Sequence, residues 1–560
     1  MGVVGLSVTS PTVVRAFDHE LVTQAGVIAV LAVVAIVVSA AMARRGPVGD
    51  VAPEPRARRV VRVGFGIIWL LDGVLQAQSA MPLGMISQVV QPASSSSPTW
   101  VQHLVNLTAT MWDLHPVRVP ASAVWIQVAL GIWLLGARRG VWSRMAGWSS
   151  LAWGLFVWVF GEAFGGLFAP GLSWLTGAPG GVLFYCAAGV LVALPERCWE
   201  SARLGRVLLA TLGGFFVAMA VLQAWPGRGY WRGAGPHGPG TLLGTVRAMT
   251  TTAQPGALRS LVARFAAVDA AHGWAVNLVV VVALGVIGAM LVRARPPGLR
   301  LAVVAGVVVC LADWVLIQDM GFWGGVGTDP NSMVPTALLL VTGYLAATAT
   351  ATATRPVEAP ASARHLTQGA SGSRAASLAA LAMLVVGTVP ALAAAADPQA
   401  SPILARAGGA TVDAVDAPSP WPGWPGDGGS GGSGPTVVTF LGNCDARGDL
   451  ATLRAAQRDL AARGDAVHVT VATSCPAASG GLPRRWVTRL TPVALARWRA
   501  AFATLSVTAA HSRGDVFYVL APDGQVCDAM ATGAAPVSAS LVSSNAVVLA
   551  GAVNRVALGL

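Results

Sequence analysis

The stretch TVVTFLGNCDARGDL, residues 436–450, predicts a buried strand that ends in a turn and leads into a helix. Cys444 stands where that strand ends. Further strands and helices alternate after it, expected at 449–463 (helix), 466–473 (strand), 491–504 (helix), a hairpin turning at the sequence PDG, and 537–557 (helix). Residues 436–560 are therefore expected to form an α/β domain in which a parallel βαβ unit precedes an antiparallel hairpin.

Four segments of this domain carry a family resemblance. TVVTFLGNCDARGDL, VHVTVATSCP, WVTRLTPVALARWRAAF and HSRGDVFYVLAPDGQV resemble, in order and spacing, the Sco/SenC branch of thioredoxin-like proteins over about residues 435–557. Members of this branch handle copper for cytochrome oxidase assembly or act as thiol reductants. The resemblance implies a thioredoxin-like fold, with Cys444 as the first cysteine of a CxxxC pair and His511 as the copper-binding histidine. Gly448 stands where the second cysteine of that pair is expected.

Cys475 offers a replacement for the missing cysteine. It follows the second expected strand as Cys444 follows the first, and neighbouring parallel strands joined by a crossover end at the same edge of a sheet. With His511 at that edge, the three side chains would form a Cys₂His cluster of the kind that suits Cu(I). Three interpretations stay open: a structural disulfide, a redox-active thiol pair with Cys444 and Cys475 as catalytic residues, and a copper site with Cys444, Cys475 and His511 as ligands.

The rest of the chain has the composition of a membrane protein. Of its 560 residues 54% are hydrophobic and only 11% are charged, and the net charge is +12. All 37 basic residues are arginines, and most of them flank apolar runs. We therefore interpret the charge as setting topology and expect a lipid bilayer, not nucleic acid, as partner. No CxxC pair occurs, which excludes zinc-ribbon and CxxC thioredoxin-type sites.

Apolar runs long enough to span a bilayer recur ten times, which predicts a polytopic helical membrane protein. They cover residues 24–43, 61–79, 119–137, 145–163, 179–195, 206–224, 274–292, 299–317, 334–351 and 377–396. Arginines gather in every second connection, which places the N-terminus and the C-terminal domain outside the cytoplasm. The tenth run reads as a retained anchor, with a cleaved signal as the alternative. A Pro- and Gly-rich linker is expected over 397–435.

Two four-helix membrane units are expected, at 60–195 and 205–351, between an N-terminal segment with the first helix (1–59) and a segment holding a cytoplasmic loop and the tenth helix (352–396). VLQA at 74–77 recurs at 221–224, and VWVFGE at 157–162 is echoed by DWVLIQD at 313–319. An even number of crossings per copy predicts a parallel tandem repeat. These units resemble the DoxX/DoxD/MauE group, whose members often accompany thiol or quinone redox proteins.

Polar side chains inside apolar runs are costly and mark candidate sites. Gln76 matches Gln223 and Glu162 is matched with Asp319, and these four are the predicted cofactor-binding residues. Asp72, Asp313 and Gln318 are further polar residues of this kind. They indicate either a proton, quinone or ion pocket between the two units, or interhelical hydrogen bonds that fix packing.

Three functions follow from these patterns. The first is an envelope thiol-disulfide or quinone-linked oxidoreductase or copper-handling protein, acting with a respiratory or other envelope membrane complex. The second is a non-catalytic assembly or interaction subunit of such a complex. The third is a metal or small-solute transporter with an outer delivery domain.

Overall fold

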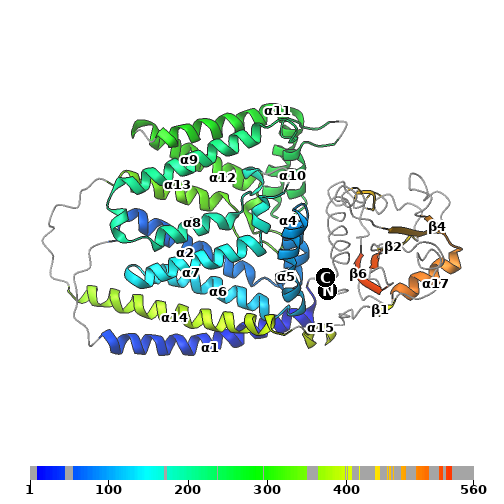
Figure 1. Ribbon diagram of the computed structural model, residues 1–560, viewed down its shortest axis with the longest axis horizontal. Coiled ribbons are helices and arrows are strands. Elements are labelled where there is room, and N and C mark those ends of the chain that lie inside the picture. Colours follow the sequence, from blue (N-terminus) through cyan, green and yellow to red (C-terminus); the bar gives the residue numbers. More distant parts are fainter. Residues whose placement is uncertain are drawn as a thin grey trace. The chain divides into compact units, whose positions relative to one another are not determined.

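Helices make up most of the structure, and a small mixed sheet lies near the C-terminus (Figure 1). The computed structural model describes residues 9–43, 54–169, 173–235, 238–293, 296–349, 363–397, 399, 401–406, 415–416, 436–441, 451, 453–455, 458, 468–473, 487–503, 516–520 and 525–531. They fall into two compact units. One holds residues 20–78 and 120–393, here called the membrane bundle, and the other holds residues 1–19, 79–119 and 394–560.

Each of the ten predicted apolar runs coincides with a helix. These helices are α1 (Pro11–Ala43), α2 (Arg56–Gln76), α6 (Arg118–Gly136), α7 (Gly140–Phe160), α8 (Gly181–Ala193), α9 (Ala202–Ala224), α11 (Gly256–Arg293), α12 (Pro296–Leu316), α13 (Met333–Ala347) and α14 (Ala363–Ala395). Shorter helices lie between them: α3 (Met81–Met85), α4 (Gln91–Ser94), α5 (Thr99–Leu114) and α10 (Thr241–Met249).

Six of these helices are long and apolar enough to cross a membrane: α1, α6, α9, α11, α12 and α14. The bent pair Arg56–Gln76 with Met81–Ser94 makes a seventh if it counts as one span. Helices α8 and α13 are also apolar but have 13 and 15 residues, fewer than the about 20 of a typical membrane-spanning helix. The chain is therefore a multi-pass membrane protein by the length and composition of its helices, and ten crossings stay a prediction.

The bundle contains two groups of four helices that correspond to the predicted units. We call α2, α6, α7 and α8 the first quartet, and α9, α11, α12 and α13 the second. Helix α13 joins them, because it contacts α2 and α8 as well as α9 and α12. One hydrophobic core runs through both quartets and contains Trp69, Tyr185, Phe216 and Leu340. Helices α1 and α14 pack on α6 through Ile28, Ala129 and Met383.

Glycine pairs hold the first two helices of each quartet together. A Cβ at Gly131 of α6 would lie 2.8 Å from the carbonyl oxygen of Gly66 in α2. In the second quartet, a Cβ on either Gly213 of α9 or Gly288 of α11 would lie 2.7 Å from the carbonyl oxygen of the other. Small residues let membrane helices approach this closely. Gly213 lies ten residues before Gln223, as Gly66 lies ten residues before Gln76, so these contacts follow the predicted repeat.

Replacing Gly213 by valine is expected to destabilise the bundle, because the side chain would collide with the backbone of α11 rather than with a movable side chain. Overpacking of this kind costs about 1–3 kcal/mol. The neighbouring Gly214 has nothing within 4 Å of an added Cβ, so Gly214→Val is the matched control. Thermal unfolding in detergent should show a lower midpoint for Gly213→Val alone. Equal midpoints for the two variants would contradict the close α9–α11 contact.

A buried arginine ties the first quartet together at the end where α6 and α8 finish. Arg58 is 0% exposed. Its Nη1 donates to Glu54 Oε1 at 2.9 Å and to the carbonyl of Arg138 at 2.6 Å, and its Nη2 donates to Ser143 Oγ at 2.8 Å and the carbonyl of Val192 at 3.2 Å. Because helix C-termini carry unsatisfied carbonyls and partial negative charge, one guanidinium stabilises the ends of two helices.

Arg62, one turn further along α2, completes this arrangement. It forms a two-pronged ion pair with Glu54, at 2.9 Å from Nε and 2.8 Å from Nη2. Its Nη1 donates to the carbonyls of Leu134 and Leu135 at the end of α6. Arg58 and Arg62 therefore share one carboxylate and satisfy the last turn of a neighbouring helix.

The C-terminal sheet has six strands in the order β1-β6-β5-β2-β3-β4. The strands are β1 (Val415–Asp416), β2 (Thr436–Leu441), β3 (His468–Thr473), β4 (Val487–Arg489), β5 (Val516–Leu520) and β6 (Gln525–Ala531). β2 pairs in parallel with β3 and antiparallel with β5, and β5 and β6 form an antiparallel hairpin. The predicted strands at 436–441 and 466–473 and the hairpin are thus confirmed.

Helix α17 (Pro492–Ala503) lies where a helix was predicted at 491–504, and it contacts β2 and β3. Phe502 of α17 packs against Phe440 of β2 and Tyr518 of β5, with ring centroids 4.9 and 5.0 Å away. Two short elements, β1 and α15 (Pro402–Arg406), lie within the segment predicted as a linker. The predicted helix at 537–557 lies outside the described residues.

Candidate functional site

Two loops with the same backbone conformation follow α7 and α12. In the first, the amides of Gly161 and Glu162 both donate to the carbonyl of Val157, at 2.7 and 2.9 Å. In the second, the amides of Ile317 and Gln318 both donate to the carbonyl of Asp313, at 2.8 and 3.1 Å. The predicted correspondence between these two segments therefore extends to their hydrogen bonds.

Left-handed backbone conformations continue the match. Ala163 and Phe164 have φ of 49° and 60°, and Asp319 and Met320 have φ of 49° and 56°. Glu162 is thus equivalent to Gln318, and the predicted match of Glu162 with Asp319 is wrong by one residue. The sequence alone favoured the wrong match because Glu162 and Asp319 are both acidic, whereas Gln318 is an amide.

Four side chains of the bundle form one electrostatically coupled group, which we call the acid pocket: Asp72, Glu162, Tyr185 and Asp329. Asp72 lies on α2 and Tyr185 on α8, whereas Glu162 and Asp329 lie in the loops that precede α8 and α13. Both quartets therefore contribute to the pocket. Only Asp72 and Glu162 were singled out from the sequence, because Tyr185 is one aromatic residue within an apolar run and Asp329 lies in a loop.

Backbone amides position the two loop acids. Oε1 of Glu162 accepts a hydrogen bond from the amide of Val182 at 3.2 Å, in the first turn of α8. A carboxylate is favoured there because helix N-termini carry unpaired N–H groups. Oδ1 of Asp329 accepts a hydrogen bond from the amide of Asn331 at 2.7 Å, in the loop before α13.

Aromatic side chains pack around Tyr185. Tyr185 is 0% exposed, and its ring packs edge-on against Phe65 and Trp69, with centroids 5.4 and 4.8 Å away. The indole of Trp69 donates to Ser150 Oγ at 2.8 Å. Asp72 is 2% exposed, and the phenol of Tyr185 is one of the groups that interact with its carboxyl.

Burial changes the acidity of the loop acids. Burial, with a smaller contribution from the nearby Asp329, raises the pKa of Glu162 to about 8, although the amide hydrogen bonds from α8 oppose this rise. Burial also raises the pKa of Asp329, although hydrogen bonds from Thr328 and Asn331 oppose this effect. Burial raises the pKa of Asp319 to about 6. Glu162 therefore titrates near neutral pH, where an ordinary glutamate is fully ionised.

Glu162 should make the stability of the bundle depend on pH. Its folded-state pKa, about 8, lies above its ordinary value of 4.5, so its stabilising contribution is complete below about pH 4.5 and is lost as pH rises to about 8. We expect the unfolding midpoint to fall between about pH 4.5 and pH 8, and Glu162→Gln to remove much of that fall. Asp319→Asn is the control, since it should alter only the acidic part of the profile. An unchanged slope in Glu162→Gln would contradict the burial of this carboxyl.

Gln223, by contrast, takes part in a satisfied network. Its Oε1 accepts a hydrogen bond from Ser173 Oγ at 2.7 Å, and its Nε2 donates to Asn277 Oδ1 at 2.8 Å. The packing role predicted for these glutamines therefore fits Gln223. In the first quartet, the buried side-chain oxygens of the equivalent Gln76 and of Gln127 have no hydrogen-bond partner among the described residues.

Asp319 and Gln318 are not members of the acid pocket, although Asn331 links the carbonyl of Gln318 to the carboxyl of Asp329. Asp319 interacts with Thr252, and it is not among the groups that perturb Asp72, Glu162 or Tyr185. Gln318 donates to Ser332 Oγ at 3.1 Å and to the carbonyl of Trp174 at 3.4 Å. The four predicted cofactor-binding residues thus occupy different environments and not one shared pocket.

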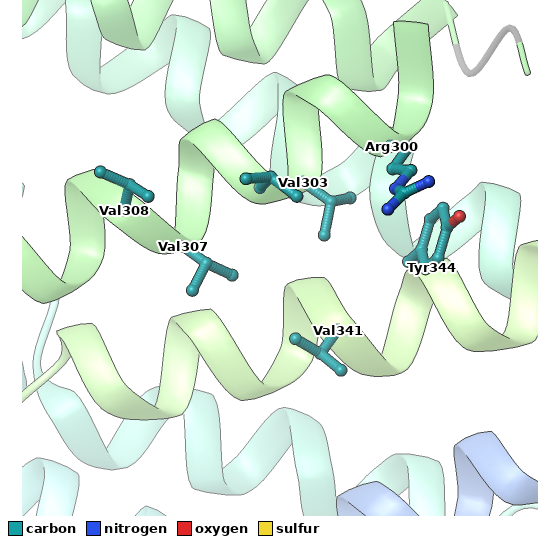
Figure 2. Close-up of a pocket in the computed structure, with 7 residues that line it drawn as sticks. Arg300, Val303, Val307, Val308, Val341 and Tyr344 are labelled. Carbon is teal, nitrogen blue, oxygen red and sulfur yellow. The ribbon is translucent and has the colours of Figure 1, made fainter. Parts of the chain in front are cut away.

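A groove of about 310 Å³ lies between α12 and α13 (Figure 2). Valines line it, and Arg300 and Tyr344 lie together at one end. The lining residues are Arg300, Val303, Val304, Val307, Val308, Val341 and Tyr344. Such a lining suits an acyl chain with an anionic headgroup rather than a polar solute.

The predicted thiol and copper residues Cys444, Cys475 and His511 lie outside the described residues. Cys527 lies in β6 between Val526, which pairs with Leu520, and Asp528, which pairs with Val519. Leu520 in turn pairs with Thr436, the first residue of β2. Cys527 therefore lies at the end of the sheet opposite to the ends of β2 and β3. Cys186, Cys198 and Cys310 in the helical part are free thiols.

No group of three or more His, Cys, Asp or Glu side chains is arranged to hold a metal ion within the described residues. No protein-family model, curated protein or solved structure matches this chain. A functional assignment therefore depends on the chain's own residues.

Proposed function

We propose that the protein is a membrane-anchored envelope protein for thiol redox or copper handling, and that its C-terminal domain carries the chemistry. The sheet order supports a thioredoxin-like fold for this domain, because a parallel β2-β3 pair lies beside an antiparallel β5-β6 hairpin. Helix α17 covers β2 and β3, as a crossover element of such a fold does.

Strand register is the observation that carries the proposal. Leu441, the last residue of β2, pairs with Thr473, the last residue of β3. In the sequence, Cys444 follows the first of these by three residues, and Cys475 follows the second by two. Adjacent strands lie about 4.8 Å apart and each further residue extends the chain by at most about 3.6 Å. The two thiols are therefore within reach of the Cα separation of about 4.4–6.8 Å that a disulfide needs.

The histidine enters from the same edge. β5 runs antiparallel to β2, and Phe517 pairs with Thr439 near the carboxyl end of β2. His511 precedes Val516, the first residue of β5, by five residues. Two thiols and one imidazole can thus meet beyond this edge and form a Cys₂His site for Cu(I), or a thiol pair whose oxidation to a disulfide delivers two electrons and two protons to a client disulfide.

In this proposal the membrane bundle is a tandem repeat of two quartets with ten crossings. The matched glycine pairs and the matched loops after α7 and α12 support the repeat. Arginines in alternate connections place both the N-terminus and the thiol domain outside, where an oxidising environment favours disulfides.

Labelling with a membrane-impermeant maleimide on whole cells tests the proposal. We expect Cys444 and Cys475 to react from outside after mild reduction and to be protected before it, because a disulfide has no free thiol. Cys198, which follows α8 on the predicted cytoplasmic side, is the internal control and should react only after lysis. Labelling of Cys444 only after lysis would contradict the proposed topology, and full labelling without reduction would contradict the disulfide.

A further inference from the structure

Hydrogen bonding in the acid pocket is incomplete. Oδ1 of Asp72, the hydroxyl of Tyr185 and Oε2 of Glu162 are all buried without a well-aligned hydrogen-bond partner among the described residues. Asp72 and Tyr185 interact with each other through their side chains. Buried polar atoms are normally fully paired, so incomplete pairing among acidic groups points to a bound proton, which turns a carboxylate acceptor into a donor.

Charge in the pocket has one sign. The groups that act on Asp72 are the carboxyls of Asp329 and Glu162 and the phenol of Tyr185, and no arginine of the described chain is among them. An ionised carboxylate in this position would be buried without a counter-charge, which costs several kcal/mol or more. A positive ligand, or protonation, removes that cost.

We propose that the acid pocket is a proton-binding site in which Asp72 is held as the neutral acid and Glu162 exchanges protons with the aqueous phase. Glu162 suits this exchange because it lies in the loop after α7 and its pKa is close to neutral pH, whereas Asp72 lies on α2 and is 2% exposed. Tyr185 interacts with both. Its hydroxyl both accepts and donates a hydrogen bond, so it can pass one proton on as it receives another.

A proton fits the pocket better than a metal ion does. Within the described residues the carboxyls do not converge in a metal-binding arrangement. Space is also limited, because a Cβ at Gly180 would lie 2.2 Å from Oε2 of Glu162. Gly180 has φ of +100°, so only glycine fits there without strain. The backbone thus closes tightly over the carboxyl of Glu162.

The two matched loops differ at the position of Glu162. At the position equivalent to Glu162, the second quartet has Gln318, whose amide is hydrogen-bonded to Ser332 and Trp174. An amide does not titrate. The second loop therefore has the same backbone hydrogen bonds as the first but no titratable group at the position of Glu162. The proton site does not depend on the proposed thiol chemistry, since it lies wholly within the bundle.

Infrared spectroscopy of the full-length protein in lipid nanodiscs tests this inference, because a neutral carboxyl has a C=O stretch distinct from that of a carboxylate. We expect Asp72→Asn to remove a neutral-carboxyl band that persists at neutral and mildly alkaline pH. Glu162→Gln should remove a band that disappears reversibly as pH rises, and Tyr185→Phe should shift the band lost in Asp72→Asn.

Two further variants make the result decisive. Glu196, whose carboxylate pairs with Arg144 at 3.2 Å, is the control, and Glu196→Gln should leave the neutral-carboxyl bands unchanged. Asp313, which is 4% exposed and also lacks partners among the described residues, should contribute a separate band that Asp313→Asn removes. An Asp72→Asn spectrum identical to wild type would overturn the inference. If that variant does not fold, the absence of a titrating band that depends on Glu162 would overturn it equally.

Discussion

Replacement of Arg58 by alanine is expected to destabilise the membrane bundle by about 3–5 kcal/mol, the cost of breaking a buried ion pair from one side. The guanidinium is fully buried and bonds Glu54, Ser143, the carbonyl of Arg138 in the connection between α6 and α7, and the carbonyl of Val192 in the last turn of α8. Its loss would leave these acceptors unsatisfied where water does not reach. Fluorescence-detected size-exclusion chromatography after heating should show a sharply lower unfolding temperature.

Arg59 supplies the matched control, because it is the next residue of α2 and is exposed. Arg59→Ala removes the same charge and should leave the unfolding temperature nearly unchanged. Arg58→Lys should fall between the two, since an ammonium cannot bond all four acceptors in the fork geometry of a guanidinium. Equal unfolding temperatures for Arg58→Ala and Arg59→Ala would contradict the role assigned to Arg58.

The second large effect is expected at the thiol domain. If Cys444, Cys475 and His511 form a Cu(I) site, Cys444→Ser should weaken Cu(I) binding by more than about 100-fold, since changes in outer-shell partners alone cost 10–100-fold. Competition with a chromogenic Cu(I) chelator on the reduced full-length protein measures this. Cys475→Ser should weaken Cu(I) binding in the same way. His511→Ala should also weaken Cu(I) binding, although both thiols remain.

Cys527→Ser is the control in this series, because β6 places residue 527 at the opposite end of the sheet. Its Cu(I) affinity should equal that of the wild type. Should wild-type protein bind no Cu(I) while Cys444 reacts rapidly with alkylating reagents, copper handling would be excluded and thiol redox chemistry would stand. Slow reaction of Cys444 together with no Cu(I) binding would contradict both.

Hydrophobic patterning predicted the helices of the bundle well, because a run of about twenty apolar residues is a strong local signal. It could not decide which helices cross the membrane. The starts of α8 and α13 agree with the predicted runs to within two residues, but both helices end before the apolar runs do. The strands β2, β3 and β5 were equally clear, since Val, Thr, Phe and Tyr dominate them.

Contacts between distant residues were beyond the reach of the sequence. Arg58 was interpreted as one of several arginines that set topology, yet its partners Arg138 and Val192 lie 80 and 134 residues away. The acid pocket shows the same limit, because Asp72 and Glu162 were noticed as polar residues in apolar runs, while Tyr185 and Asp329 give no local signal. Their functional meaning depends on α2, α8 and α13 being neighbours.

The pairing of cysteines in the native protein tests the central claim most directly. Arginines separate Cys444 from Cys475 in the sequence, so tryptic digestion of unreduced protein places the two residues on different peptides. The proposed geometry predicts a Cys444–Cys475 cross-linked peptide that disappears on reduction. A Cys444–Cys527 link, or free thiols at both 444 and 475 in protein isolated under oxidising conditions, would show that the two sulfurs do not meet beyond the ends of β2 and β3.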